Sequence, residues 1–325
     1  MGKNMLTVSE GFALYLSKRA LAESSVEVKT RAKRLFIEAI GDLPVKSVSF
    51  AEAEDYKMWL AKSRSVASAN IYLANLKPYF GWLKMRGHID QDPFATITLF
   101  ETEHKRREVF GPAEIERILR VADLRWQMIT LLGLCSLRRS EVLNLTVDDI
   151  NWQGGYIRIT PKADSQTTWQ WAIKNHRAAI VPMPEIFTLP DMIVNLHNLL
   201  RELITELPIG QPYVCVQPET YERLLMMKSV GGLTWKWRNC PWQNFTRDWL
   251  RILKRAAVNR RCFKALRATM PTEMSQRGVP IKDVQQLLRH KSIQTTAEYY
   301  IATDERRLIQ TTAEIASKFY VSNVS

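Results

Sequence analysis

The segment LLRHKSIQTTAEYY, residues 287–300, is the most informative stretch of this chain. It contains one histidine, two adjacent threonines and a pair of tyrosines, and Tyr299 follows His290 by nine positions, since 299 − 290 = 9. A tyrosine that only packs in a hydrophobic core needs no such polar neighbours. These neighbours favour a reactive role for the tyrosine pair, and two other segments carry residues of matching chemistry.

The two other segments supply arginine, glutamate and lysine. The stretch LRRSE contains Arg138 and ends at Glu141. The stretch FKALR contains Lys264 and ends at Arg267. In chain order the three segments read R-x-S-E, then K-x-L-R, then L-x-H with a tyrosine nine residues further on.

These segments resemble the three catalytic boxes of the tyrosine recombinases, the phage integrase family, and they occur in the order typical of that family. The resemblance covers roughly residues 107–305. It implies an enzyme that cuts and rejoins DNA through a covalent 3′-phosphotyrosyl intermediate, without a metal ion, ATP or another cofactor. It also implies that Tyr299 is the nucleophile, because the tyrosine of the family stands nine residues after the histidine. Tyr300 is then assigned to packing.

The chemistry explains why such residues are needed. Attack on a DNA phosphorus places negative charge on the non-bridging oxygens, and two guanidinium groups can bind these oxygens while staying charged at any working pH. Arg138 and Arg267 are the candidates for this role. Glu141 is expected to orient the site by pairing with a basic neighbour, unless it is an ordinary carboxylate on a helix face. His290 is expected to donate a hydrogen bond to a phosphate oxygen.

A lysine that protonates the leaving 5′ oxygen is also implied by the resemblance. Two residues compete for this role, Lys162 in TPKADS and Lys174 in IKNHR. The lysine of the family commonly lies eight residues before a Val-Pro strand end, and here 182 − 174 = 8, with Pro182 after Val181. Lys174 is therefore preferred, and Lys162 is the second choice.

Two residues depart from the pattern of the family. Lys264 stands where histidine is most common; a lysine there can bind phosphate, but it is a poor general base unless its pKa falls. Arg289 replaces the usual glycine of L-G-H. It is expected to add positive charge near DNA, although a side chain at this position could crowd the turn.

The stretch that leads into Arg267 is strongly basic, with no acidic residue from Trp249 to Thr272. Such a run is usually a solvated face, but its place beside an active-site arginine predicts contact with the DNA backbone. Contacts to phosphates position a duplex without reading its sequence. The predicted DNA-binding residues are Lys254, Arg255, Arg260, Arg261 and Arg289.

The first hundred residues are predicted to form a helical domain. Thr7-x-x-Glu10 fits a capping box at the start of the first helix. The longest helix is expected from about Val66 to Arg86, with a kink or break at Pro78. The arrangement resembles the core-binding domain of the same family.

The charged segment TEHKRREVF, residues 102–110, is predicted to link a DNA-binding domain at 1–101 to a catalytic domain at 111–325. The catalytic domain is expected to be mostly helical. Its strand-like segments are 156–160, 167–173, 178–184 and 212–216. The expected fold class is thus mainly α with a small antiparallel β-sheet (α+β).

The overall composition favours a polyanionic partner. The net charge is +13, and residues 105–325 hold +11 of it, since they carry 32 Lys and Arg against 21 Asp and Glu. No apolar run is long enough to span a membrane and the start lacks an apolar signal segment, which predicts a cytoplasmic protein. Four cysteines without a C-x-x-C pair and five scattered histidines predict no metal site.

The sequence therefore predicts a site-specific DNA recombinase or integrase of a mobile element. Its expected partners are double-stranded DNA and copies of itself, assembled as a tetramer on DNA through a carboxy-terminal helix that begins near Asp304. Two alternatives are a DNA-binding relative that no longer cuts and a type IB topoisomerase, which uses the same chemistry. A generic helix-turn-helix regulator is a third, more distant possibility.

Overall fold

The computed structural model describes residues 5–102, 108–173 and 178–300. The chain divides into two compact units, Met1–Glu103 and His104–Ser325. Each unit has its own large hydrophobic core. None of the helices in the described ranges is both long and apolar enough to cross a membrane.

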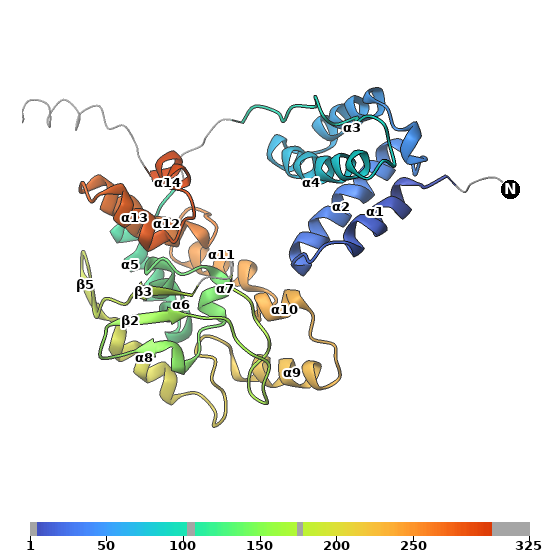
Figure 1. Cartoon of the computed structure of the whole chain (residues 1–325). Coiled ribbons are helices and arrows are strands. Elements are labelled where there is room, and N and C mark those ends of the chain that lie inside the picture. Colours follow the sequence, from blue (N-terminus) through green and yellow to red (C-terminus); the bar gives the residue numbers. More distant parts are fainter. Residues whose placement is uncertain (1–4, 103–107, 174–177, 301–325) are drawn as a thin grey trace, which may run out of the picture. The chain divides into compact units, whose positions relative to one another are not determined.

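The first unit is a helical bundle, drawn in blue to cyan in Figure 1. It contains α1 (Val8–Ser17), α2 (Glu23–Ile40), the short 3-10 helix η1 (Val45–Ser47), α3 (Phe50–Ser63) and α4 (Val66–Met85). The predicted capping box at the start of α1 is confirmed, because the Thr7 side chain accepts from the backbone of Glu10 while the Glu10 carboxylate accepts from the Thr7 N–H.

An aromatic core holds the bundle together. The Phe36 ring meets the rings of Tyr56 and Phe80 edge-on, with centroids 5.2 Å and 5.7 Å apart, and Phe94 stacks on Phe80 at 4.8 Å. Helix α4 continues past Pro78 without a break. The buried residues on both sides of this proline pack against the same core, which keeps the two halves of α4 in one helix.

The second unit surrounds a buried helix, α6. Its helices are α5 (Pro112–Val121), α6 (Leu124–Leu134), α7 (Arg139–Leu143), α8 (Leu196–Thr205), α9 (Pro218–Ser229), α10 (Trp235–Asn239), α11 (Phe245–Arg255), α12 (Lys264–Gln276), α13 (Ile281–Leu288) and α14 (Ile293–Tyr300), with the 3-10 helix η2 (Val147–Asp149). Most of α6 is buried and apolar on all sides, as expected of a helix in the middle of a core. It packs against α8 and α12.

Two small antiparallel sheets complete the second unit, which confirms the predicted fold class. The first sheet contains β1 (Ile150–Asn151), β2 (Tyr156–Ile159) and β3 (Ala179–Pro182), in the order β1-β2-β3. Ile157 pairs with Val181 in the centre of this sheet. The second sheet is a hairpin that the sequence did not predict, β4 (Ile186–Leu189) and β5 (Met192–Asn195).

The strand predicted at 212–216 is wrong. This segment makes a single bridge, between Tyr213 and Thr146. Its carbonyl groups bind side chains instead: Arg125 donates to Val214 and Val216 at 3.2 Å and 2.9 Å. An apolar run predicts burial, but here the partly buried side chain of Arg125 and the buried side chain of Gln211 take the place of a neighbouring strand.

The strand predicted at 167–173 is also wrong. The segment makes one isolated bridge, between Trp171 and Lys162. Trp169 lies flat on Tyr213, with ring centroids 3.9 Å apart and an interplanar angle of 9°. Its backbone N–H donates to the Tyr213 hydroxyl at 3.1 Å, and its indole N–H donates to Asn144 at 2.9 Å. Side chains again replace the hydrogen bonds of a sheet.

The contact between α6 and α12 leads to a test of packing. A Cβ atom added at Gly133 of α6 would lie 3.0 Å from the Phe263 ring and 3.1 Å from Leu266. We expect Gly133→Ala to lower the free energy of unfolding of the second unit by about 1–3 kcal/mol, because the crowded core must shift. Denaturant titration followed by fluorescence measures this change.

Gly81 of α4 provides the matched control. A Cβ atom there meets Asp92 at 3.5 Å, an ordinary contact. Gly81→Ala is expected to stabilise the first unit by up to about 1 kcal/mol, because alanine favours the helix. Equal changes in the free energy of unfolding for Gly133→Ala and Gly81→Ala would contradict the close packing of α6 on α12.

Candidate active site

A buried glutamate gathers the predicted site residues. Glu141 lies in α7, and only 4% of the residue is exposed. Its Oε1 accepts from Nη1 of Arg138 at 2.6 Å, and its Oε2 accepts from the Arg138 backbone N–H at 2.7 Å. Oε2 also accepts from Nη2 of Arg289 at 2.8 Å, and Nη1 of Arg267 lies 3.8 Å away. The structure therefore brings the two predicted arginines to one carboxylate.

Two neighbouring segments fix Arg267. Its guanidinium donates to the carbonyls of Ser136, just after α6, and Leu288, at the end of α13. The Ser136 hydroxyl in turn donates to the Arg267 carbonyl at 3.3 Å. Arg267 is thus buried in α12 with an orientation set by both neighbouring segments, while a quarter of the Arg138 side chain remains exposed.

Burial and charge act against each other on Glu141. Burial tends to raise the pKa of its carboxyl group, but the attraction of Arg289 and Arg138 outweighs burial and holds the pKa below its ordinary value. Three guanidinium groups around one carboxylate leave a formal excess of two positive charges, since 3 − 1 = 2. A pocket with this balance suits an anion such as a phosphate diester.

His290 follows directly after Arg289, in the turn between α13 and α14. Its Nδ1 lies 3.0 Å from the hydroxyl of Thr296, a fully buried residue of α14. Its backbone is tied to Gln285, whose side-chain amide donates to the His290 carbonyl at 3.0 Å. The contact with Thr296 holds the imidazole ring beside α14, and the contact with Gln285 holds the backbone of the turn.

The structure places the backbone of the two candidate nucleophiles, Tyr299 and Tyr300, in the last turn of α14. Helix α14 packs against α12 and α13, the helices that carry Arg267 and lead to Arg289. The side chains of both tyrosines lie outside the described part of the structure. The same holds for Lys174 and for the predicted carboxy-terminal helix.

Lys162, the second choice for the hairpin lysine, is held by an acidic residue. Its Nζ donates to both carboxylate oxygens of Asp149, at 2.6 Å for Oδ2. Only 10% of the Lys162 side chain is exposed. Asp149 also accepts from the backbone N–H and the hydroxyl of Thr146, both at 2.8 Å. This sequestered pair argues for a structural role of Lys162.

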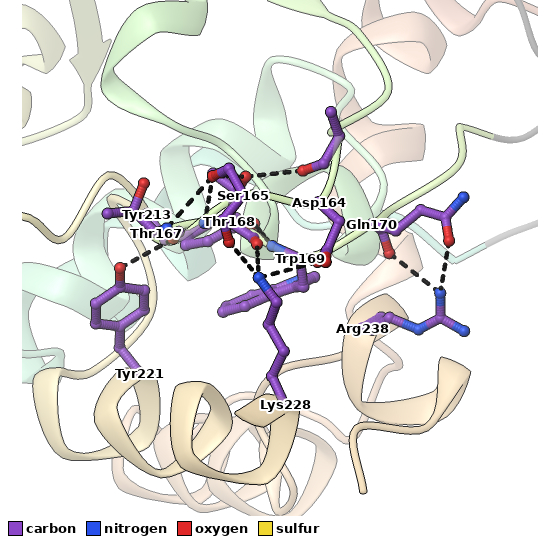
Figure 2. A network of polar contacts seen from close by, with 11 residues as sticks. Asp164, Ser165, Thr167, Thr168, Trp169, Gln170, Tyr213, Tyr221, Lys228 and Arg238 are labelled. Atoms are coloured by element: carbon purple, nitrogen blue, oxygen red, sulfur yellow. Dashed lines mark hydrogen bonds and ion pairs between the residues drawn. The ribbon is translucent and has the colours of Figure 1, made fainter. Parts of the chain in front are cut away.

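The long connection between β2 and β3 is fastened to α9 by Lys228. We call residues 163–171 the anchored loop. Figure 2 shows Nζ of Lys228 beneath this loop, where it pairs with Asp164 at 3.0 Å and donates to the carbonyls of Ser165 and Thr168, the latter at 2.7 Å. One ammonium group therefore binds three points of the loop.

A second contact reaches the loop from α9, because the Tyr221 hydroxyl donates to the Thr167 carbonyl at 2.9 Å. On the other side, the stack of Trp169 on Tyr213 closes the loop against the core. The described part of the connection runs on to Ile173, which is also buried in that core. The connection is therefore fixed as far as Ile173, the residue that precedes Lys174.

The predicted DNA-contacting residues separate into two groups. Lys254, Arg255 and Arg260 are exposed, as is Lys264 at the start of α12. Arg261 instead binds Glu114 at 2.7 Å and only 14% of its side chain is exposed. The carboxylates of Glu114 and Glu141 hold the mostly buried side chains of Arg261 and Arg289, and contact of these two residues with DNA stays a prediction.

Sequence reasoning missed two features of the site, the Ser136 carbonyl and the inward turn of Arg289. Backbone acceptors carry no sequence signal, so the first could not be found. The second had a signal: glycine is usual at position 289 in this pattern, which indicates a left-handed turn. Among the described residues, no group of three or more His, Cys, Asp or Glu is placed to hold a metal ion.

Comparison with known proteins identifies the family. The model of the phage integrase family matches residues 108–307, which include the arginines around Glu141 and both tyrosines. The chain belongs to the phage integrase family. A similar family member is a tyrosine recombinase of Pseudothermotoga lettingae, which is 23% identical over 272 residues and covers 82% of each chain.

Solved structures of two integrases share the fold. The Tn1549 transposon integrase in complex with a circular intermediate DNA has a TM-score of 0.71 at 16% identity, over 95% of this chain and 99% of that one. A lambda integrase tetramer bound to a Holliday junction has a TM-score of 0.65 at 15% identity, over 90% of this chain and 78% of that one.

The charge of Glu141 leads to a test of stability. Glu141→Gln leaves the guanidinium groups of Arg138 and Arg289 without a counter-charge in a buried place. We expect the free energy of unfolding of the second unit to fall by about 3–5 kcal/mol at pH 7. Urea titration over a range of pH measures the difference between the two proteins.

The pH dependence of this difference has a defined sign. The pKa of Glu141 is lowered in the folded state from the ordinary 4.5, so its contribution is complete above that pH and is lost as pH falls through the folded pKa. The gap between the proteins should therefore narrow in acid. Glu273→Gln is the control, because Glu273 makes an exposed pair with Arg277 and its loss should cost less than about 1 kcal/mol. Equal losses in both variants would contradict the role given to Glu141.

Proposed function

We propose that this chain is a site-specific DNA recombinase of a mobile element, which cuts and rejoins duplex DNA through a phosphotyrosyl intermediate. The observation that carries the proposal is the convergence of Arg138 and Arg267 on one buried carboxylate, in the domain that belongs to the phage integrase family. The fold shared with a transposon integrase supports a role in a mobile element.

The two arginines would bind the non-bridging oxygens of the scissile phosphate. Negative charge on these oxygens grows as a fifth oxygen approaches phosphorus, so cations held in place beforehand stabilise the transition state more than the substrate. Arg267 is held by two backbone carbonyls, and Arg138 by Glu141. Little reorganisation of these groups is then needed during the reaction.

Tyr299 would be the nucleophile. Its hydroxyl oxygen forms a bond to phosphorus, and the bond from phosphorus to the 5′ oxygen breaks. The phosphate stays bonded to the 3′ oxygen and joins the 3′ end of the DNA to tyrosine. A 5′ hydroxyl from another strand then attacks and releases the tyrosine, so the bond is conserved without ATP. The net positive charge around Glu141 would favour the phenolate form of a nearby tyrosine. His290 would add a hydrogen bond to the phosphate.

Lys174 would give the proton that the leaving 5′ oxygen needs. Lys162 is the weaker candidate, because Asp149 occupies its ammonium group. Lys264 lies exposed on α12, three residues before Arg267, and would bind the same phosphate or the next one. The described loop before Lys174 is anchored to α9, which would limit the positions open to this lysine.

The remaining contacts would extend along the DNA and between subunits. The exposed residues Lys254, Arg255 and Arg260 would bind the DNA backbone, and the helical unit 1–101 would hold the duplex as the core-binding domain. Assembly into a tetramer through the segment after Tyr300 remains our proposal, supported by the fold shared with the lambda integrase tetramer. The predicted cytoplasmic location fits work on DNA.

The nucleophile can be tested by trapping the covalent intermediate. Cells that express the protein are lysed in SDS, the protein is recovered, and the attached DNA ends are sequenced to map the cleavage site. Wild type should yield adducts at defined positions. Tyr299→Phe should yield none, because phenylalanine has no hydroxyl group to bond to phosphorus.

Tyr300→Phe is the matched control and should keep the adduct. If Tyr300→Phe lost the adduct and Tyr299→Phe kept it, Tyr300 would be the nucleophile instead of Tyr299. Absence of any adduct in wild type would favour a DNA-binding relative that no longer cuts. Adducts without sequence preference, together with relaxation of supercoils by a monomer, would favour a topoisomerase.

The leaving-group acid can be tested with a mapped duplex in which sulfur replaces the bridging 5′ oxygen. A thiol has a pKa near 8.5, so a thiolate leaves without a proton donor. Lys174→Met should cleave the ordinary duplex roughly 100-fold or more slowly than wild type and the sulfur duplex at nearly the wild-type rate.

Lys162→Met separates the two candidate lysines. Because Lys162 is paired with Asp149, its loss should destabilise the second unit and slow cleavage of both duplexes to the same extent. Selective recovery of Lys162→Met on the sulfur duplex would assign the proton to Lys162 instead.

A further inference from the structure

Arg289 adopts a backbone conformation that arginine rarely occupies. It ends α13 with φ 55° and ψ 43°, in the left-handed region that favours glycine. Three non-glycine residues in the described part of the chain have positive φ, namely Ser136, Ala257 and Arg289. Two of these three belong to the candidate active site, and they touch each other.

The side chain of Arg289 is unfavourable for stability as well. Among the described residues its Nε and Nη1 atoms are buried without a hydrogen-bond partner. Burial also lowers the pKa of its guanidinium group. A residue that strains the backbone and buries two unpaired donors is expected at a position where function requires it.

The one satisfied nitrogen of Arg289 makes two contacts. Nη2 donates to Oε2 of Glu141 and to the Ser136 carbonyl, each at 2.8 Å. The same Ser136 carbonyl accepts from Arg267, and the same carboxylate accepts from Arg138. Ser136 has φ 67°, so its carbonyl is itself aimed by a left-handed turn. Arg289 thus shares an acceptor with each proposed phosphate-binding arginine.

We infer that Arg289 is a positioning residue. It offsets the negative charge of Glu141, so that the positive charges of Arg138 and Arg267 remain available to the scissile phosphate. This inference rests on the proposed function of that site. Without Arg289, the full charge of Glu141 would act on the other two guanidinium groups. Their attraction to the carboxylate would then compete with the phosphate during the reaction. Arg289 is not given a phosphate contact, because its remaining nitrogens are enclosed.

Arg289→Gly tests the inference without straining the backbone, because glycine accepts the left-handed conformation. On the duplex mapped from the covalent adducts, the rate of adduct formation at saturating DNA should fall about 10- to 100-fold. The DNA concentration for half-maximal rate should change less than about threefold, since DNA binding is left to other residues. Arg289→Asn, which also tolerates this backbone, should behave alike.

Arg277→Gly is the matched control. Arg277 also ends a helix, α12, and pairs with a glutamate, but its φ is −82° and three quarters of its side chain is exposed. Its replacement should leave adduct formation unchanged. An unchanged rate in Arg289→Gly, or an equal loss in Arg277→Gly, would overturn the inference.

A double-mutant cycle with Glu141→Gln separates positioning from direct phosphate binding. If Arg289 acts through the charge of Glu141, Arg289→Gly should slow adduct formation strongly while Glu141 is present. In the Glu141→Gln background, adding Arg289→Gly should lower the rate of adduct formation by less than about threefold relative to Glu141→Gln alone. A full additional loss in that background would overturn the inference in favour of a direct contact.

A DNA-free measurement keeps this test apart from the proposed function. In protein labelled with isotopic arginine, Arg289→Gly should shift the Nε–H resonances of Arg138 and Arg267, whereas Arg277→Gly should not. Unshifted resonances would overturn the inference. Failure of wild type to form any adduct would instead overturn the proposed function, while the resonances still report whether Arg289 positions the two arginines.

Discussion

A buried carboxylate that keeps its charge is the constraint on which the second unit depends. Glu141 can stay ionised away from water only because guanidinium groups surround it, and those groups come from the start of α7, from α12 and from the end of α13. More than a hundred residues separate the first of these segments from the other two. Since a buried charge without partners is strongly unfavourable, formation of the pocket and folding of the unit are expected to occur together.

The hydrophobic core positions the residues around Glu141 through helix α6. Most of this helix is buried and apolar, and it ends beside Ser136, so its burial fixes where the following turn begins. The turn then aims the Ser136 carbonyl at Arg267 and Arg289. A second carbonyl, that of Leu288, binds Arg267 from α13. Packing of the apolar residues therefore sets the positions of Arg267 and Arg289. The link between the core and these arginines is made by backbone carbonyl groups.

Capping and periodicity signals were sufficient for the helices that begin at Val8 and at Val66, because those signals are local. The strands at 156–160 and 178–184 were also predicted correctly, since they alternate in a way that suits a sheet. The segments 167–173 and 212–216 were not, because apolar patterns report burial and say nothing of hydrogen-bond partners. Those partners proved to be the side chains of Arg125 and Tyr213, among others. Tertiary contacts of this kind are fixed only when the whole chain folds.

Motif order located the site, but its electrostatics required the structure. The sequence grouped Arg138, Arg267 and Glu141 correctly by likeness to a family. It could not tell which basic residues face solvent, because lysine and arginine look alike in a charge count. The capture of Lys162 by Asp149 was hidden for this reason.

The basic residues of the second unit consequently fall into two groups. Arg261, Arg267 and Arg289 are turned inward, where carboxylates and carbonyls bind them and salt screens them little. Lys254, Arg255 and Arg260 remain exposed, where attraction to a polyanion is strong but weakens as salt is added. Affinity for DNA and stabilisation of the reacting phosphate would then rest on different residues. Added salt should reduce occupancy of the DNA far more than it reduces the rate of the bound complex.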